Sequence, residues 1–443
     1  MTLTEKQIKY TLHIIAKIAF PGLEYECRVN ANEVSIRIKD TNVQFSLLEQ
    51  HEASALLSGK LDMTDIPSRN LKYSIPVAFP QKSKDTNKIF YSIEGDEVKI
   101  LADIVTLSFI LLSRYEDYIC TNRDAYGRMS YKDSLAKVYD FIDIPIVDEY
   151  ALLVRKIVCA HSPTIIITPR VGQIIPTHDI DNLLLFPNVH STIKRMVWDF
   201  LYGVYKLKPK DSLRAIRTFM SYITGKDPYV KAIYSLAKLS KNCGFRSEFY
   251  FLGYDTTHKD YRYDANNPLV RDCMKYIEDV GMVVGFHAGF GTCDNDAEFL
   301  NQKDKVDNIL GKKATRGRQH FLCFNHNSPA VWDKCGMETD MTLGYHDREG
   351  FACGTSHPYP LYDIMSDTVL NVIEQPLIVM DGTLLERRNL SPSESLERIV
   401  LLCNRTLDAE GDFVILWHNS GLHRKWYRYY TDAYVPFMKM FSK

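Results

Sequence analysis

The sequence predicts an α/β protein in which parallel strands carry helices on their outer side. From about residue 166 onward, short apolar runs alternate with longer segments of helical periodicity. This alternation is typical of either a doubly wound sheet or a barrel. Polar clusters follow several of the runs, at the carboxyl ends of the predicted strands. Because these ends converge in such folds, we expect the clusters to form one site.

The chain has 443 residues, which is enough for two domains. We expect a smaller mixed α/β domain over residues 1–165 and the strand–helix domain over 166–443. In the first domain, the patterns predict two helices and two strands. The helices are expected at 7–19 and 103–118, and the strands at 25–28 and 33–38. Nothing in this domain has catalytic spacing, so its role stays open.

In the second domain, six strands are expected, each apolar and bounded by polar or turn-forming residues. They are 164–167, 247–252, 282–286, 319–324, 377–380 and 413–417. An insertion of helical character at about 191–241 interrupts the alternation of strands and helices. Within it, Asp227 and Pro228 form an N-cap and N1 pair for a helix that runs to about Leu239.

The insertion is basic, with eleven Lys or Arg residues against three Asp, and aromatic residues are interleaved with them. Two interpretations stay open. The first is a solvated helix pair that packs its aromatic side chains inward. The second is a face for an anionic membrane surface or a phosphorylated, lipid-linked glycan carrier.

Composition, charge and cysteine spacing bear on the partner and the cellular compartment of the protein. A net charge of −1 gives no reason to expect a nucleic-acid partner. The first residues carry charges of both signs and do not form a secretory signal. The longest apolar stretch, 104–112, is too short to cross a bilayer. Ten cysteines are scattered without a Cys-x-x-Cys pair, which favours reduced thiols and a cytoplasmic protein.

The polar cluster with the most information is Thr177-His178-Asp179-Ile180-Asp181. Two carboxylates two residues apart at a strand end project to the same side. Like charges at that distance favour a metal, a cationic partner or a shared proton. An ordinary strand-to-loop junction is the competing interpretation, because Asp is common in turns and at helix N-caps.

Further clusters follow other predicted strands or lead into them. His287 lies among three glycines, where a ligand can approach without crowding. Arg318 can hold an ionised carboxylate through its planar guanidinium. A glycine-punctuated loop carries His346 and His357, and His418 ends the last strand.

The order of these clusters resembles the polysaccharide deacetylase (NodB-homology) superfamily. The more similar group is a Bacteroides-type branch, in which the deacetylase domain follows an N-terminal domain of unknown function. The phrases at 112–118, 318–322 and 344–351 are similar to that branch, so the resemblance covers essentially the whole chain. It implies a distorted (β/α) barrel of about seven strands and a divalent metal, most often zinc.

The resemblance also implies roles for individual residues. Asp179 would be the general base, Arg318 would position it, and His418 would be the general acid. Asp181 and His287 would bind the metal, which would activate a water and polarise an amide carbonyl. Three further residues are expected to contact the substrate: Leu416, Trp417 and Tyr345. The implied reaction removes an acetyl group from an N-acetylated sugar of a surface-glycan or lipid-linked intermediate.

The sequence departs from the superfamily at one metal ligand. The second motif normally supplies two His residues four apart, and position 291 is Gly. His320 is the nearest substitute, and three other His residues are candidates from loops: His258, His346 and His357. Two alternatives to the deacetylase stay open: an inactive glycan-binding protein, and a metal-free hydrolase using Asp179 and Asp181. The second is disfavoured, because these carboxylates lie too close for glycosidic cleavage. The oligomeric state is not predicted.

Overall fold

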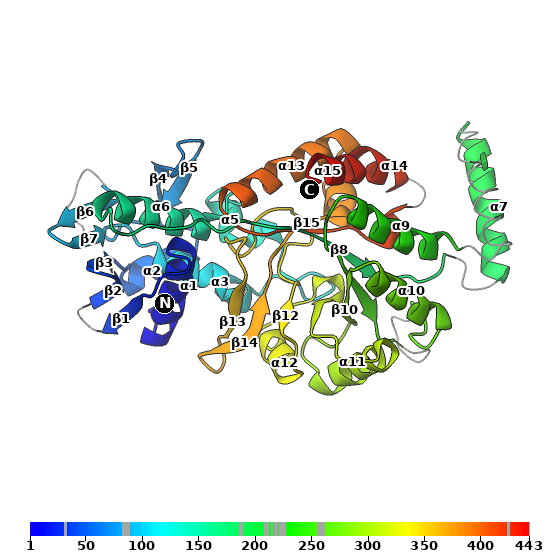
Figure 1. The fold of residues 1–443 in the computed structure, drawn as a ribbon, viewed down its shortest axis with the longest axis horizontal. Coiled ribbons are helices and arrows are strands. Elements are labelled where there is room, and N and C mark those ends of the chain that lie inside the picture. The colour runs from blue at the N-terminus through cyan, green and yellow to red at the C-terminus, as the bar shows by residue number, and fades with distance from the viewer. Residues whose placement is uncertain are drawn as a thin grey trace. The chain divides into compact units, whose positions relative to one another are not determined.

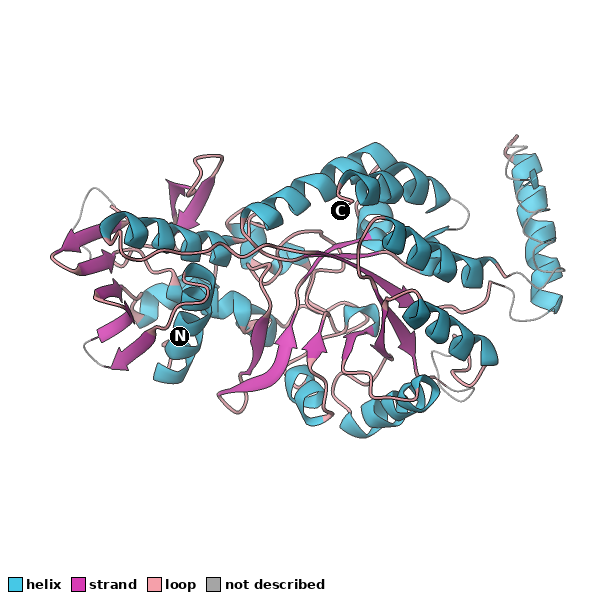
Figure 2. Cartoon of the chain, viewed as in Figure 1, coloured by secondary structure: helices cyan, strands magenta, loops and turns pink. Residues whose placement is uncertain are grey.

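The structure is a computed structural model that forms two compact units. It describes residues 1–30, 33–81, 89–185, 189–207, 212–213, 216, 220, 227–254, 262–422 and 426–442. The first unit comprises Met1–Ile174, Phe321–Val379 and Leu401–Val414. The second comprises Ile175–His320, Met380–Val400 and Ile415–Lys443. Figures 1 and 2 show the elements of both units.

Helices and strands alternate along much of the described chain. The α-helices are α1 (Glu5–Ala19), α2 (Gln50–Leu57), α3 (Val105–Leu112), α4 (Tyr115–Ile119), α5 (Leu135–Val138), α6 (Ile146–His161), α7 (Val189–Tyr205), α9 (Pro228–Asn242), α10 (Pro268–Asp279), α11 (Asp296–Leu310), α12 (Ser328–Lys334), α13 (Pro392–Asp408), α14 (Tyr427–Tyr429) and α15 (Val435–Met440). The strands are β1 (Glu26–Asn30), β2 (Glu33–Ile38), β3 (Thr41–Phe45), β4 (Thr64–Pro67), β5 (Ser74–Val77), β6 (Tyr91–Glu94), β7 (Glu97–Ile100), β8 (Ile174–Ile180), β9 (Glu248–Leu252), β10 (Val283–Ala288), β11 (Arg316–Gln319), β12 (Thr339–Asp340), β13 (Tyr359–Asp363), β14 (Thr368–Glu374), β15 (Leu377–Met380) and β16 (Phe413–Leu416).

The N-terminal part of the first unit contains a five-stranded sheet in the order β1-β2-β3-β7-β6. The predicted helix at 7–19 is confirmed as α1, whose N-cap Thr4 forms a reciprocal capping box with Gln7. The predicted strands at 25–28 and 33–38 are confirmed as β1 and β2, which pair antiparallel. An isolated two-stranded hairpin is at best marginally stable in water, so the pairing of β1 and β2 with further strands of this sheet stabilises them.

The predicted helix at 103–118 is interrupted. Its first part is α3, which is buried along its whole length, and its second part is the short α4. Between them, Arg114 has φ 56°, in the left-handed region that a continuous helix cannot contain. Its buried guanidinium donates to the carbonyl of Ala352 in the same unit, and this contact accompanies the turn that ends α3.

The larger sheet has nine strands in the linear order β13-β14-β12-β11-β10-β9-β8-β16-β15. It therefore differs from the expected barrel of about seven strands. The α/β class itself is confirmed: β8, β9, β10 and β11 run parallel to one another, in registers that place Asp179 opposite Tyr250 and His287 opposite Arg318. Both α10 and α11 pack against β10, and α10 buries an apolar face at positions 270, 273, 274 and 277.

Two of the predicted strands are wrong. Residues 164–167 form no strand; Ile166 is 79% exposed, and the strand of this region is β8, ten residues later. The strand predicted at 319–324 is misplaced. The observed strand, β11, is Arg316–Gln319 and ends at the residue where the predicted strand begins. Two arginines made β11 look polar, yet Arg318 is fully buried beside a carboxylate. The other four predicted strands are confirmed as β9, β10, β15 and β16.

Part of the expected insertion is described. It contains α7 and α9, and Asp227 caps α9 by accepting from the backbone N–H of Tyr229, as predicted. Residues 208–211, 214–215, 217–219 and 221–226 of the insertion lie outside the described part of the chain. Among the helices that the structure describes, none combines the length and the apolar character that crossing a bilayer requires.

Candidate active site

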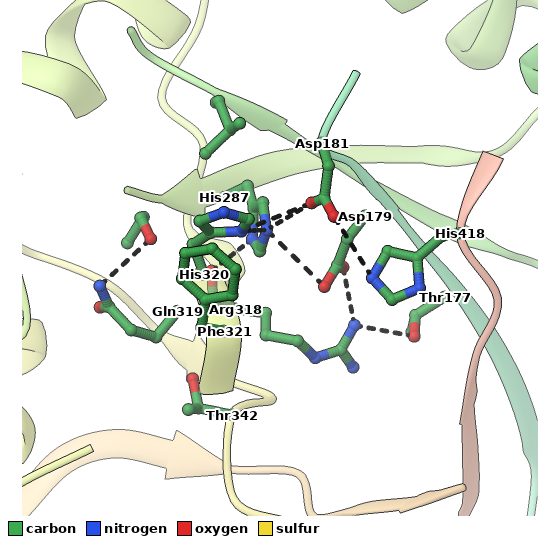
Figure 3. A network of polar contacts seen from close by, with 12 residues as sticks. Thr177, Asp179, Asp181, His287, Arg318, Gln319, His320, Phe321, Thr342 and His418 are labelled. Atoms are coloured by element: carbon green, nitrogen blue, oxygen red, sulfur yellow. Dashed lines mark hydrogen bonds and ion pairs between the residues drawn. The ribbon is translucent and has the colours of Figure 1, made fainter. Parts of the chain in front are cut away.

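Two carboxylates lie at the end of β8 in the second unit, Asp179 within the strand and Asp181 directly after it. Asp179 is 2% exposed, and the side chain of Asp181 is 22% exposed. Because they are two residues apart on one strand, both project to the same side. Figure 3 shows them facing side chains from β10, the end of β11 and the end of β16. The site therefore draws on strand ends that are distant in the sequence.

Arg318 balances the charge of Asp179. Its Nη1 atom donates to Asp179 Oδ1 at 2.9 Å and to the hydroxyl of Thr177 at 3.0 Å (Figure 3). The guanidinium has no exposed surface and lies over the ring of Tyr250, with its Cζ atom 5.3 Å from the centroid. A buried ion pair of this kind holds both partners in one geometry.

The tautomer of His287 follows from its partner. Its Nδ1 atom lies 2.9 Å from the backbone oxygen of Arg318, on the neighbouring strand. A carbonyl oxygen only accepts, so Nδ1 carries the proton and donates. The lone pair of Nε2 in the neutral ring then points toward Asp181, whose Oδ1 atom is 3.2 Å away. An imidazole held in this way by a backbone carbonyl is typical of metal-ligating histidines.

His320 completes a group of three ligand atoms. Its Nδ1 atom lies 2.9 Å from His287 Nε2 and 3.4 Å from Asp181 Oδ1, and the three residues form a cluster that fits a metal ion. Atoms about 2.0–2.2 Å from a common tetrahedral zinc would be separated by about 3.3–3.6 Å. The measured separations of 2.9, 3.2 and 3.4 Å are close to this range. The residues present therefore fit a divalent cation.

The charge state of Asp181 also suits a ligand. Burial opposes its ionisation, but the neighbouring imidazoles of His320 and His418 hold the pKa of this carboxyl well below its usual range. Asp181 is therefore a carboxylate at neutral pH. Two imidazoles and one carboxylate form a donor set that zinc commonly takes in catalytic sites.

His418 lies on the other side of Asp181, with its Nε2 atom 3.6 Å from Asp181 Oδ2. Its Nδ1 atom lies 2.7 Å from Asp381 Oδ1, and its backbone N–H donates to Asp381 Oδ2. Burial opposes protonation of this ring, but the carboxylates of Asp381 and Asp181 outweigh it and raise the pKa of His418 to about 10. The imidazolium is therefore the dominant form at neutral pH.

Sequence reasoning missed Asp381. This residue is fully buried and directly follows β15, a strand that was predicted from its apolar run. The rule that found Asp179, His287 and His418 applies equally to Asp381: a polar residue directly after a predicted strand is a site candidate. The signal was thus present in the sequence.

The predicted substrate-contacting residues occupy buried positions. Leu416 and Trp417 have no exposed surface, and the Trp417 indole stacks on Tyr434 at 4.7 Å between ring centroids. Tyr345 belongs to the first unit, where its hydroxyl donates to Glu116 at 2.8 Å. Their contact with a substrate stays a prediction.

The other candidate ligands differ from His320. His346 and His357 belong to the first unit; His357 Nε2 lies 2.9 Å from the backbone oxygen of Ala409, and His346 Nε2 lies 3.5 Å from Asp124. His258 lies outside the described residues. At Gly291 φ is +86°, a backbone conformation that a histidine would adopt only with strain. Among the candidates that the structure describes, only His320 lies beside Asp181 and His287.

Comparisons with known proteins give a partial picture. Residues 1–163 match the model of a family of unknown function, DUF7033. A search of curated proteins finds no match. Among solved structures, the chain is similar to polysaccharide deacetylases and family 4 carbohydrate esterases. These likenesses have low TM-scores and low sequence identity.

Three of these structures are representative. One is from Mycobacterium smegmatis and is provisionally described as a polysaccharide deacetylase (14% identity, TM-score 0.37, 57% of this chain and 78% of that chain). The second is a family 4 carbohydrate esterase from Streptomyces lividans, in complex with acetate (13%, 0.30, 61% and 88%). The third is a family 4 pseudoenzyme from Bacillus anthracis (9%, 0.28, 62% and 62%).

Proposed function

We propose that this chain is a metal-dependent carbohydrate deacetylase that removes an acetyl group from an N-acetylated sugar of a surface-glycan or lipid-linked intermediate. The observation that carries the proposal is the arrangement around Asp181. Two imidazole nitrogens lie within 3.4 Å of one of its oxygens, and the protonated His418 lies 3.6 Å from the other. Together with Asp179, this arrangement provides a cation site, a base and an acid.

Asp181, His287 and His320 would hold the divalent cation, and their donor set favours zinc. When bound, the cation would act as a Lewis acid that polarises the amide carbonyl of the substrate. Arg318 and Thr177 keep the Asp179 carboxylate in one orientation through the Nη1 contacts described above. The Nδ1–H group of His287 donates to the backbone oxygen of Arg318, so the lone pair of Nε2 is available to coordinate the cation.

Asp179 would act as the general base and accept a proton from the attacking water. The amide carbon then gains a C–O bond, and its C–N bond breaks when the tetrahedral species collapses. His418 would donate the proton from Nε2 to the departing amine nitrogen, since Asp381 holds the other ring proton at Nδ1. The products are acetate and a free amino sugar: the proton on Asp179 passes through solvent to re-protonate His418, and the acetic acid that forms releases its proton to solvent.

The second candidate function is a catalytically inactive glycan-binding protein. The observation that favours it is Gly291, which stands where the superfamily places a metal-ligating histidine. The two candidates differ in one measurable property: only the enzyme releases acetate.

The direct experiment is acetate release from a panel of N-acetylated mono- and oligosaccharides, with the metal-loaded full chain. We expect turnover of at least one member, a loss of about 10²-fold or more in Asp179→Asn, and unchanged activity in Asp279→Asn. Asp279 is exposed at the end of α10 and serves as the matched control. Sugar binding without acetate release, unaffected by Asp179→Asn, would favour the glycan-binding protein.

Several broader assignments belong to the same proposal. We place an N-terminal domain at 1–165 and the deacetylase-like domain at 166–443, in a Bacteroides-type branch of the superfamily. We also place the reaction in the cytoplasm, because all ten cysteines are free thiols and a reducing compartment keeps them so. A carbohydrate is the proposed partner, and the net charge of −1 gives no reason to propose a nucleic acid.

A further inference from the structure

One face of α7 exposes an unusual amount of apolar surface. Ile193, Val197, Leu201 and Val204 are spaced by four, four and three residues, so they share one side of the helix. Their exposed fractions are 47%, 44%, 56% and 54%. Large apolar side chains in such a row are normally buried, and a contiguous exposed row marks an interaction surface.

Aromatic residues border this row. Trp198 and Tyr205 are seven residues apart, so they lie on the same side, next to the row. They are 68% and 78% exposed. Trp and Tyr combine an apolar ring with one polar group, which favours the boundary between lipid and water.

Positive charge accompanies the apolar row. Residues 191–241 contain eleven Lys or Arg against three Asp, whereas the whole chain has a net charge of −1. Lys194 on α7 and Lys206, directly after its last residue, are exposed, and Lys206 Nζ lies 5.2 Å from the centre of the Tyr205 ring. A cation held beside an interfacial aromatic residue is placed to meet an anionic headgroup.

We propose that α7 is an interfacial helix that lies in the plane of an anionic membrane surface. The row formed by Ile193, Val197, Leu201 and Val204 enters the boundary between headgroups and acyl chains, and Lys194 and Lys206 contact the headgroups. This binding goes beyond the proposed reaction and does not depend on it. It would bring the catalytic unit to a membrane that carries lipid-linked substrates.

A second copy of the chain fits this face less well than a membrane does. Two antiparallel or parallel α7 helices packed on the apolar row would bring their basic residues together, and Asp199 is the only acidic residue in α7. Coiled-coil pairs instead place opposite charges beside the seam. An anionic bilayer can bury the apolar row and attract the basic residues at the same time.

The test is flotation of the full chain with lipid vesicles. We expect the chain to float with phosphatidylcholine vesicles that contain phosphatidylglycerol, to remain behind with phosphatidylcholine alone, and to bind more weakly at high salt. The Leu201→Asp/Val204→Asp double variant should lose at least about 10-fold in affinity for the anionic vesicles, because each charge opposes insertion. The Leu300→Asp variant, on the exposed surface of α11, should bind as the wild type does.

Three results would overturn the proposal. The first is no flotation with anionic vesicles. The second is equal flotation of the double variant, checked for folding by circular dichroism. The third is a dimer in light scattering that the same two substitutions abolish, since a second copy would then cover the face. In support, Trp198 emission should shift to shorter wavelength on vesicle addition, and Trp198→Phe should remove that shift.

Discussion

His418 and Asp381 are joined by two contacts. One carboxylate oxygen of Asp381 lies 2.7 Å from the ring Nδ1 atom of His418, and the other accepts the backbone N–H of the same residue at 2.9 Å. The carboxylate thereby fixes both the ring and the strand end that carries it. It also favours the charged imidazolium, which is the form that a general acid needs.

Replacing Asp381 with Asn should therefore weaken the acid. The Asn side chain keeps a similar shape but removes the negative charge, so the pKa of His418 should fall from its raised value. We expect kcat for acetate release to fall by about 10²-fold, and the alkaline limb of the pH–rate profile to move to lower pH. An unchanged alkaline limb would mean that His418 is not the acid that this profile reports. Asp279→Asn is the control for loss of a carboxylate elsewhere.

Arg318→Met should destabilise the second unit. The substitution leaves the Asp179 carboxylate buried beside an apolar side chain, and breaking a buried ion pair in this way costs about 3–5 kcal/mol. We expect a lower melting temperature, with partial recovery in the Arg318→Met/Asp179→Leu double variant, which buries no unpaired charge. Arg28→Met, at an exposed ion pair with Glu26, should change the melting temperature little. Equal effects of the two single variants would contradict the role of burial.

His178 predicts a dependence of stability on pH. Burial, opposed by the contact of its ring with the Trp417 carbonyl, lowers the pKa of this histidine to about 4. An unfolded chain takes up the proton near pH 6.5, so the stability that neutral His178 confers is present above that pH and is lost as the pH falls toward 4.

The measurement is the free energy of unfolding at pH 7 and at pH 5. For the wild type, His178 should lower it by about 2 kcal/mol between the two values, and the His178→Gln variant should lack this part of the decrease. His51→Gln, at an exposed position, should behave as the wild type does. If wild type and His178→Gln lose the same free energy, the buried neutral ring is not the cause.

Elements with simple hydropathy were predictable from the sequence. The apolar runs of β9, β10, β15 and β16 predict buried strands, and the apolar spacing at 7–19 predicts α1. By contrast, β11 was misplaced because Arg316 and Arg318 belong to the strand and pair with Glu248 and Asp179. Hydropathy treats a charged residue as exposed, and only the tertiary partner reveals that it is buried.

The candidate site was predictable to a similar extent. Asp179, His287 and His418 were identified as polar residues that follow apolar runs. Their order along the chain then produced the resemblance to the deacetylase superfamily. The choice among substitutes for the ligand missing at Gly291 depends on three-dimensional distance, because His320 lies 33 positions from its partner His287. Asp381 was missed although its strand was recognised.

The most direct test of the account is the metal content of the purified full chain, measured by elemental analysis after dialysis against limiting zinc. We predict about one equivalent of a divalent metal per wild-type chain, and a large loss of bound metal in His320→Ala as well as in Asp181→Ala and His287→Ala. His346→Ala and His357→Ala, in the first unit, should keep the wild-type content. A wild-type chain that binds no divalent metal, or a His320→Ala chain that binds as much as the wild type, would contradict the three-ligand site.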